Sequence, residues 1–560
     1  MKFESITIKN FRNFKNITVK LGNKNIFFGL NNVGKTNFLY AFRFVFDKEI
    51  RKNNLIDSDF HQRKCDDPIE IIVKIDISDV GCTDNQKLRA KLRGALLSEH
   101  KKVYIKLFAE YNQNEMMAMP IMSWGGSLDS LQEMKPRGYM YEVDYIMNVI
   151  YIDSYVDLNK LFKKNVAHLI KNDEEEDSAI LDEISKTVES LNTKISSLSG
   201  VKDFENKITP EYQKFRDDDV SVSVKSEIAI KGLYSNVIPY IKNGNNDELY
   251  PTSGEGRKKL LAYSIYELIA KENSERKINL FLIEEPENHL HKSMQIALSQ
   301  ILFNDEKYKY LFLSTHSPYI LNEMDKVNLV RIYNESKIDS TSQFYEVPKK
   351  FSTNKKLLNK GLSEAIFSDT VLLIEGPSEQ MLFEKVLSVV NPQYEAEGIY
   401  ILSVNGVGFK SYVDILKGLS IKTFIKTDND LRKVEKTEDY SVLGFSRINS
   451  YVEDEYKLPV KRIKINSVSS KRNLYRENKD NLDNIRDEYN IYLSKCDLEN
   501  DLDEFLHQEL SEILNTDNVV KYLQDSKHYH MVELVEKISD EDCRKITDHY
   551  NFSFFKEISK

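Results

Sequence analysis

Apolar and polar residues alternate in two runs near the start of the chain, at residues 3–8 and 16–21, and a continuous apolar run follows at 26–28. These patterns predict short strands. From about residue 157 to 207 the sequence becomes polar, acidic and helical, and its apolar positions step by four and three along one predicted helix face: Ile184, Val188, Leu191, Ile195 and Leu198. We expect a helical insertion there. A helix that covers its own domain and a short dimerising pair both stay open, because the repeat is too brief to establish a coiled coil.

The second half of the chain has a different order of predicted elements. Strand-like runs return at 278–283 and 311–314, and the polar stretch 336–353 indicates a link. Beyond it, strand-like runs alternate with helix-like segments in a βαβαβ order, which predicts a parallel sheet: strands at 371–374, 399–404 and 423–426, and helices at 378–390 and 409–418. The predicted domains are residues 1–345 with the insertion at about 157–222, a linker at 346–366, an α/β domain at 367–484 and a mainly helical part at 485–560.

Hydrophobic residues make up 41% of the 560 residues and charged residues 30%, which is typical of a folded protein and excludes a disordered or fibrous chain. No stretch approaches the roughly 20 apolar residues of a membrane span, and no apolar signal segment opens the chain, so we expect a cytoplasmic protein. The net charge of −9 argues against a globally basic nucleic-acid coat but leaves local basic patches open. The four scattered cysteines lack zinc-ligand spacing and are expected to be reduced thiols.

The first chemical motif matches the phosphate-binding pattern G-x-x-x-x-G-K-[ST] and lies between a predicted strand and a predicted helix: Gly29-Leu30-Asn31-Asn32-Val33-Gly34-Lys35-Thr36. Backbone N–H groups of such a loop cradle phosphate, Lys35 can reach the terminal phosphates, and the Thr36 hydroxyl can ligate Mg²⁺. We therefore predict ATP binding here, with Asn32, Gly34 and Asn37 as further cofactor-binding residues. A plain strand-to-helix turn is the weaker interpretation.

A second apolar run delivers carboxylates to the C-terminal end of a predicted strand, where α/β sheets place ligands: Leu280-Phe281-Leu282-Ile283-Glu284-Glu285-Pro286-Glu287. We predict that Glu284 holds Mg²⁺ through water and that Glu285 polarises the attacking water. His316 ends another strand-like run near where a γ-phosphate would lie, although a lone histidine is more often structural. The loop at 253–257, Ser-Gly-Glu-Gly-Arg, can present amides to an anion, although such a loop is usually just a turn.

Taken in order, these elements resemble the ABC-type ATPases of recombination and repair. In that resemblance Ser253, Gly254 and Gly256 form the signature loop, His316 is the switch histidine, and Arg12 fits the N-terminal arginine motif. The resemblance implies a head-to-head homodimer in which the signature loop of one chain faces the nucleotide held by the other. The first Walker B acid is Glu284 rather than the commoner Asp, which puts the hydrolysis rate in doubt more than nucleotide binding.

A second acidic set lies in the predicted α/β domain. Glu375 ends an apolar run and Glu379 follows one helical turn later, so both carboxylates can face one point. Asp428 and Asp430 end the third strand-like run, and neighbouring parallel strands bring such ends together. Four clustered carboxylates repel one another unless cations neutralise them, so we predict Mg²⁺ or Mn²⁺ there. Taken separately, Glu379 on an exposed helix face and an ordinary Asx-rich turn at 428–430 would fit about as well.

Together these acids look like a Toprim domain, and an ABC ATPase joined to Toprim resembles the OLD (overcoming lysogenisation defect) nucleases. Within them, the runs at 493–502 and 522–527 resemble the endonuclease subunits of Gabija antiphage systems. The resemblance implies Asp497 as a further metal ligand, Lys527 as the cation facing the scissile phosphate, assembly into a tetramer and a helicase-like partner subunit. From the residues alone, Asp497 could equally be a helix N-cap and Lys527 a surface lysine.

The leading hypothesis is a divalent-metal-dependent endonuclease that nicks or cleaves double-stranded DNA in antiphage defence and is gated by ATP, with the family leaning towards restraint of cleavage by ATP. Residues 461–476 contain six basic residues and no acid, so they could follow phosphates, although a solvated face is the usual explanation. Two alternatives stay open. One is a DNA-repair or SMC-like ATPase that binds DNA without cleaving it, and the other is a topoisomerase-like enzyme that forms a tyrosyl-DNA adduct.

Overall fold

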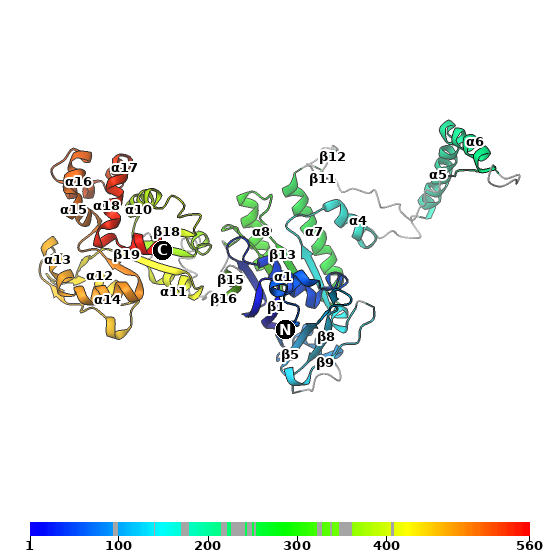
Figure 1. The fold of residues 1–560 in the computed structure, drawn as a ribbon, viewed down its shortest axis with the longest axis horizontal. Coiled ribbons are helices and arrows are strands. Elements are labelled where there is room, and N and C mark those ends of the chain that lie inside the picture. Colours follow the sequence, from blue (N-terminus) through cyan, green and yellow to red (C-terminus); the bar gives the residue numbers. More distant parts are fainter. Residues whose placement is uncertain are drawn as a thin grey trace. The chain divides into compact units, whose positions relative to one another are not determined.

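The computed structural model describes residues 1–92, 99–138, 140–169, 178–213, 221–225, 241–242, 249–250, 254–321, 327–335, 339–346, 361–404 and 408–559. The chain divides into two compact units, one formed by Met1–Ile152 and Lys277–Lys560 and the other by Asp153–Arg276 (Figure 1). Each unit is described by itself below.

The alternating pattern at the start of the chain forms an antiparallel sheet. Its strand order is β2-β1-β4-β5-β8-β9, with β1 at Lys2–Phe11, β2 at Phe14–Lys20, β4 at Ile69–Asp76, β5 at Lys102–Ala109, β8 at Ile121–Gly125 and β9 at Gln132–Glu133. Every second residue of β4 and β5 is buried, as expected for a sheet with one face on the core. Phe3, Ile6 and Ile8 of β1 belong to that core.

A second sheet carries the nucleotide motifs. Its order is β10-β13-β14-β3-β15-β16, and it is parallel except for the edge strand β16. The strands are β3 (Lys24–Phe28), β10 (Met147–Ile152), β13 (Ile278–Glu284), β14 (Leu311–Ser314), β15 (Asn328–Asn334) and β16 (Ser340–Glu346); α1 (Lys35–Phe46) follows β3 and α8 (Lys292–Asn304) follows β13. Because β13, β14 and β3 are parallel neighbours, the motifs at their C-terminal ends meet at one edge of the sheet.

The predicted βαβαβ segment forms a separate parallel sheet in the order β18-β17-β19-β23. The strands are β17 (Thr370–Ile374), β18 (Ile399–Ser403), β19 (Lys422–Thr427) and β23 (Ile491–Leu493), with α10 (Pro377–Val390) after β17 and α11 (Lys410–Gly418) after β18. A small antiparallel sheet and three helices lie between β19 and β23 in the sequence: β20 (Leu431–Lys433), β21 (Tyr440–Val442), α12 (Leu443–Ile448), β22 (Arg462–Ile463), α13 (Val468–Glu477) and α14 (Lys479–Tyr489).

The C-terminal helices share one hydrophobic core with this parallel sheet. They are α15 (Leu498–Leu514), α16 (Val519–Asp525), α17 (Lys527–Lys537), α18 (Asp540–Asp548) and α19 (Phe554–Ile558). Phe383 of α10 packs against Phe554, with the ring centroids 5.3 Å apart. The sheet and the helices that follow it therefore form one module, residues 361–559.

The unit Asp153–Arg276 is helical, with α4 (Leu158–Leu169), α5 (Ser178–Ser196), α6 (Ser199–Gln213), α7 (Glu255–Asn273) and the short strands β11 (Ile241–Lys242) and β12 (Leu249–Tyr250). Helices α5 and α6 lie side by side (Figure 1). The prediction that Leu198 continues one helix face is wrong, because α5 ends at Ser196. The hydroxyl of Ser197 donates to the carbonyl of Lys194 at 2.8 Å, a local bond that competes with helix continuation.

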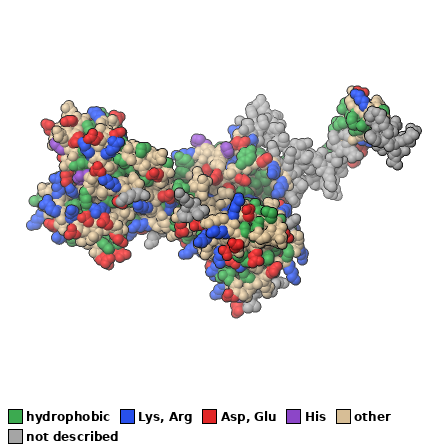
Figure 2. All heavy atoms as spheres, viewed as in Figure 1, with side chains coloured by type: hydrophobic (Ala, Val, Ile, Leu, Met, Phe, Trp, Pro, Cys, Tyr) green, Lys and Arg blue, Asp and Glu red, His purple; other side chains and the backbone are tan. Residues whose placement is uncertain are grey.

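Lys and Arg side chains are mixed with Asp and Glu over the face shown in Figure 2, in keeping with the small net charge of −9. Among the described residues, none of the helices is long and apolar enough to cross a membrane. All four cysteines fall in the described part of the chain and are free thiols, as predicted.

Candidate nucleotide and metal sites

The phosphate-binding loop leaves β3 and enters α1, the context that the motif requires. Gly29 has a φ of 149°, and a Cβ there would meet the carbonyl oxygen of Ile332 at 2.1 Å, so only glycine fits beside β15. Gly34 also has a positive φ, 102°, and precedes the first residue of α1. The predicted loop residues Asn32 and Thr36 are exposed, which leaves them open to a ligand.

Lys35 is buried under this loop. Its ammonium group donates to the carbonyls of Gly29 at 3.1 Å and Leu30 at 2.7 Å. Burial lowers the pKa of Lys35 to about 8, against the opposing effect of the carboxylates of Glu285 and Glu287. The lysine is thus held among the loop carbonyls beside the predicted Walker B acids. From there its ammonium group can bind a phosphate group of the nucleotide.

Arg12 reaches the start of α1 and is fixed there by several partners. Its guanidinium donates to Asp59 at 3.0 Å and to Asn37 Oδ1 at 2.9 Å, and it lies over the Tyr40 ring at 4.2 Å from the centroid. Two predicted cofactor-binding residues, Arg12 and Asn37, are therefore in direct contact.

The predicted Walker B acids and the predicted switch histidine also meet. Glu284 is the last residue of β13 and is buried, and Glu285 follows it with a positive φ of 41°. The His316 imidazole Nε2 lies 3.3 Å from Glu285 Oε1. Burial, together with the nearby charge of Lys35, lowers the pKa of His316, so the neutral imidazole is favoured beside the phosphate loop.

Glu287, which ends the run at 280–287, joins this group through its carboxylate. Its carboxylate accepts the backbone N–H of His316 at 2.7 Å and the hydroxyl of Thr315 at 2.9 Å. Burial raises the pKa of Glu287, although these hydrogen bonds oppose that shift. Glu287 thus ties the end of β13 to the end of β14 and holds the backbone of His316.

The predicted signature loop lies in the other unit. Gly254 precedes α7 and Gly256 lies in its first turn, whereas Ser253 falls outside the described residues. The facing of this loop towards a partner's nucleotide stays a prediction.

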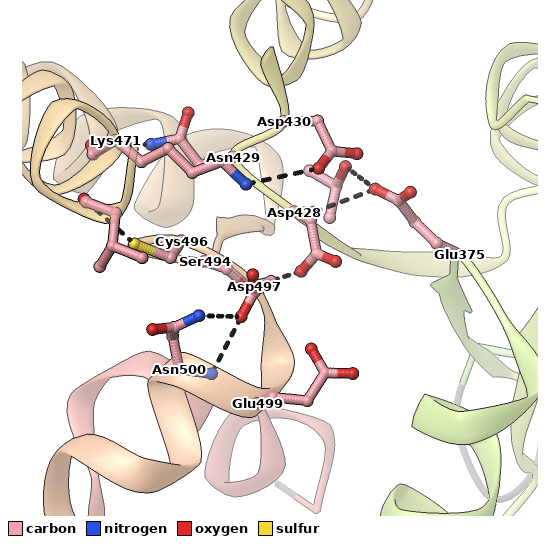
Figure 3. A network of polar contacts seen from close by, with 12 residues as sticks. Glu375, Asp428, Asn429, Asp430, Lys471, Ser494, Cys496, Asp497, Glu499 and Asn500 are labelled. Carbon is pink, nitrogen blue, oxygen red and sulfur yellow. Dashed lines mark hydrogen bonds and ion pairs between the residues drawn. The ribbon is translucent and has the colours of Figure 1, made fainter. Parts of the chain in front are cut away.

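The second acidic set converges at the C-terminal edge of the module's parallel sheet (Figure 3). Glu375 leaves the end of β17, and its Oε1 accepts the Thr427 hydroxyl at 2.6 Å and the backbone N–H of Asp428 at 3.0 Å. Next to β19, strand β23 ends at Leu493, and the hydroxyl of the following residue, Ser494, donates to Asp428 Oδ1 at 3.0 Å. Three adjacent strand ends therefore fix Asp428 and Glu375 in one place.

The turn at 428–430 is not an ordinary exposed Asx-rich turn. Asn429 between the two aspartates is completely buried, and its side-chain amide donates to the carbonyls of Lys471 at 3.0 Å and Lys495 at 3.2 Å. Its backbone N–H donates to the carbonyl of Cys496 at 3.0 Å. The turn is thus tied to α13 and to the loop after β23, which fixes where Asp428 and Asp430 point.

Glu379 is also buried, so the alternative of an exposed helix face is wrong. One carboxylate oxygen accepts the backbone N–H of Gly376 at 2.7 Å, and the other, Oε1, is buried without a hydrogen-bond partner. Burial, with a smaller contribution from the charge of Glu375, raises the pKa of Glu379 to about 7.

Both residues taken from the Gabija resemblance lie beside this cluster. Asp497 is the N-cap of α15, as its alternative interpretation proposed, and its Oδ1 accepts the backbone N–H of Asn500 at 2.9 Å. Lys527 lies 3.3 Å from the buried carboxylate of Glu499. Burial alone would lower the pKa of Lys527, but the carboxylates of Glu499, Asp428 and Asp497 raise it above its ordinary value.

The donor set fits a hard divalent cation, which prefers oxygen ligands. Burial, then the charges of Glu379, Glu375, Asp430 and Asp497, holds the pKa of Asp428 well above its usual range. Such mutual repulsion is what a bound cation relieves. Within the described part of the chain, no three Asp, Glu, His or Cys side chains converge at ligand distance as they stand. The residue types nonetheless fit the ion.

Sequence reasoning missed several residues of this edge. Thr427 and Ser494 hold the acids through hydroxyl groups, and Lys471 lies 3.7 Å from Asp430 Oδ1. Arg447 contacts Glu375 and lies 17 residues from Asp430 in the sequence, in a short helix with no motif around it. Only the location of Lys471 in the basic run 461–476 offered a signal. Tyr475 of that run is buried and packs inside the module.

Comparisons with known proteins agree with this arrangement. Residues 366–430 match the TOPRIM domain of overcoming lysogenization defect protein-like proteins, and residues 1–120 and 147–321 match an AAA ATPase domain. These matches confirm the predicted fold class and imply a divalent metal and a nucleotide. A solved SMC head bound to the C-winged helix domain of ScpA covers 62% of the chain at 14% identity with a TM-score of 0.35, too low to carry an argument.

Two relatives extend over most of the chain. The Old nuclease of Escherichia phage P2 is 21% identical over 472 residues, which are 79% of this chain and 80% of the relative. Endonuclease GajA of Bacillus cereus (strain VD045) is 43% identical over 575 residues, which cover 100% of this chain and 99% of the relative. With that identity along its whole length, the chain belongs to the OLD-like family of the GajA endonucleases.

Proposed function

We propose that the chain is a divalent-metal-dependent endonuclease that cuts or nicks double-stranded DNA at the Toprim edge and is regulated by ATP at the phosphate-binding loop. The observation that carries the proposal is the meeting of Glu375 and Asp428, with Asp430 beside them, at neighbouring parallel strand ends in a member of an endonuclease family. Glu375, Glu379, Asp428, Asp430 and Asp497 are the proposed ligands of Mg²⁺ or Mn²⁺.

The bound ions would activate water and stabilise the leaving oxygen of the phosphodiester. The chain's own groups position these acids: the hydroxyls of Thr427 and Ser494 orient Glu375 and Asp428. Lys527, whose ammonium group keeps its charge among Glu499 and the acids, is the proposed contact to the scissile phosphate. Exposed basic residues of the run 461–476 are the proposed path for the DNA backbone, since Lys471 of that run reaches Asp430.

A plasmid assay in which metal and ATP are varied independently tests this proposal. Purified protein should convert supercoiled DNA to nicked or linear forms with Mg²⁺ or Mn²⁺, and Glu375→Gln should abolish the conversion. Glu488→Gln, which removes an exposed carboxylate of α14 in the same module, is the matched control and should cut normally. ATP hydrolysis that DNA stimulates without any cleavage would instead support the DNA-binding ATPase, and a covalent tyrosyl-DNA adduct would support a topoisomerase.

A set of contacts around Arg331 supports the proposed gating by ATP. The phosphate-loop strand β3 pairs with β15, and Arg331 of β15 is buried. Its guanidinium donates to the carbonyls of Leu419 at 3.3 Å and Ser420 at 2.8 Å, just before β19, and it contacts Asp369, just before β17. Glu375 and Asp428 follow β17 and β19. Arg331 therefore connects β15, which pairs with the phosphate-loop strand β3, to both strands that carry these acids.

We propose that ATP restrains cleavage through these contacts of Arg331. In a nicking assay, ATP should slow wild-type cleavage, and Arg331→Met should weaken that effect while ATP binding persists. Lys35→Ala should also remove the effect, but through loss of ATP binding, so a direct binding measurement separates the two variants. Cleavage that ATP leaves unchanged in the wild type would exclude the gating.

Family membership also supports an antiphage role, a homodimer formed through the ATPase heads and assembled into a tetramer, and a helicase-like Gabija partner. Light scattering with and without nucleotide tests the assembly. Co-purification with a helicase-like protein encoded next to this chain tests the partner.

A further inference from the structure

Arg447 enters the acidic cluster of the module from a short helix. Its guanidinium contacts the carboxylate of Glu375 and lies 3.3 Å from Asp430 Oδ2 and 3.3 Å from Thr427 Oγ1. The two carboxylates come from different strand ends, β17 and the turn after β19. One guanidinium nitrogen, Nη1, therefore bridges two of the acids to which the proposed function gives the metal.

The helix that carries Arg447 is fixed to the same turn. The backbone N–H groups of Leu443 and Gly444 donate to the carbonyl of Asp430 at 2.8 Å and 3.2 Å. A Cβ at Gly444 would meet the carbonyl oxygen of Asp428 at 2.7 Å, so α12 packs as closely on the turn as glycine allows. This packing fixes the backbone of Arg447 beside the acids, so its position is set by the fold of the module and not by a mobile surface loop.

A guanidinium N–H group and a divalent cation both bind the oxygen lone pairs of a carboxylate, so they compete for them. The guanidinium also places a positive charge close to the proposed cation site, and the repulsion between the two weakens the binding of the ion. We propose that Arg447 is a positioning residue that competes with the divalent metal for Glu375 and Asp430 and so sets the metal concentration that the nuclease site requires. This inference rests on the proposed assignment of these acids to the metal.

Mn²⁺ binding without DNA tests the competition, with free Mn²⁺ measured by electron paramagnetic resonance on the full-length protein. Arg447→Gln should bind Mn²⁺ about tenfold more tightly than the wild type, since one unit charge is removed from the ligand pair. Arg447→Lys keeps the charge on a shorter side chain, which should contact the two acids less closely, so its Kd should lie between the two. Arg432→Gln, which removes an exposed charge two residues after Asp430, is the control and should change the Kd little.

Glu375→Gln separates this site from any Mn²⁺ held at the nucleotide loop. In that background Arg447→Gln should no longer tighten binding. Equal or weaker Mn²⁺ binding by Arg447→Gln, or tightening that Arg432→Gln reproduces, would overturn the inference. If Arg447→Gln fails to fold, as judged by circular dichroism, the Arg447→Lys comparison decides, and an unchanged Kd would refute competition. A wild-type protein that binds Mn²⁺ but cuts no plasmid would defeat the proposed function and leave this binding comparison intact.

Discussion

Replacing Lys426 by Met should destabilise the module through a charge left alone in its interior. Lys426 lies on β19, directly before Thr427, and its ammonium nitrogen is 3.6 Å from Asp501 Oδ2 of α15. Both side chains are only 1% exposed. Asp501 also accepts the backbone N–H groups of Lys495 at 3.1 Å and Cys496 at 3.4 Å, in the loop that holds Asn429. The pair thus lies directly beneath the proposed nuclease site.

Removing one partner of a buried ion pair costs about 3 to 5 kcal/mol, because the remaining charge keeps its desolvation penalty. The double variant Lys426→Met/Asp501→Asn removes both charges and retains an acceptor for the loop. It should cost only about 1 to 2 kcal/mol, which implies a coupling energy of about 3 kcal/mol or more between the two positions.

The pH dependence has a definite sign. Burial raises the pKa of Asp501 even with Lys426 present. A carboxyl whose pKa is raised by folding binds a proton more readily when folded, so its contribution to stability is lost as pH rises above the ordinary value. Without the positive charge of Lys426, the pKa of Asp501 should rise further. The stability deficit of Lys426→Met should therefore be larger at about pH 8 than at about pH 5.

Hydrogen exchange of α15 and thermal unfolding measure these costs. A module of this size loses about 2 to 4 °C per kcal/mol, so Lys426→Met should lower its Tm by on the order of 10 °C. Lys422→Met removes an exposed lysine from the same strand and should have little effect. The reasoning fails if the two lysine variants are equally destabilised, or if the double variant loses the sum of its single losses.

Three further predictions concern the two sites. Lys35→Ala should weaken ATP binding about 10- to 100-fold, as measured by calorimetry, because a charge-assisted phosphate contact is lost; unchanged affinity would contradict the loop assignment. Lys527→Met should slow plasmid cleavage about 10²- to 10³-fold with little change in DNA affinity, whereas the exposed Lys521→Met on α16 should not. The pKa of Glu379 is raised to about 7, so its carboxyl must lose a proton before it can ligate; Mn²⁺ affinity should rise as pH increases through 7, and a Glu379→Gln variant with the same pH profile would exclude Glu379 as a ligand.

The sequence predicted those parts of the sites that depend on local order along the chain. The phosphate loop, Glu284, Glu285 and Glu375 each follow an apolar strand, and the C-terminal ends of parallel strands meet by geometry. The aspartates at 428–430 were found for the same reason. Such motifs are visible because the strand and its functional residue are adjacent in the chain.

Other parts depend on contacts between distant segments, which a single sequence does not display. Arg447 enters the cluster because α12 packs on the turn after β19, and Asp501 meets Lys426 only after β23 pairs with β19. The break between α5 and α6 was missed for a different reason, since the apolar spacing continues through Leu198 while the helix ends at Ser196 and the Ser197 hydroxyl bonds back to Lys194. Asp497 shows that a capping role and a place beside the acids are compatible in one residue.

The strand orders bear on how a newly made chain acquires its activities. The phosphate-loop strand β3 lies between β14 and β15, which are synthesised long after it, and β19 gains its second neighbour only when β23 at Ile491–Leu493 has been made. A chain that stops before β14 therefore lacks both neighbours of the phosphate-loop strand, and one that stops before Ser494 lacks the hydroxyl that holds Asp428. Prematurely terminated copies are expected to be inert towards DNA, so translation errors would yield aggregation-prone strand edges rather than uncontrolled cutting.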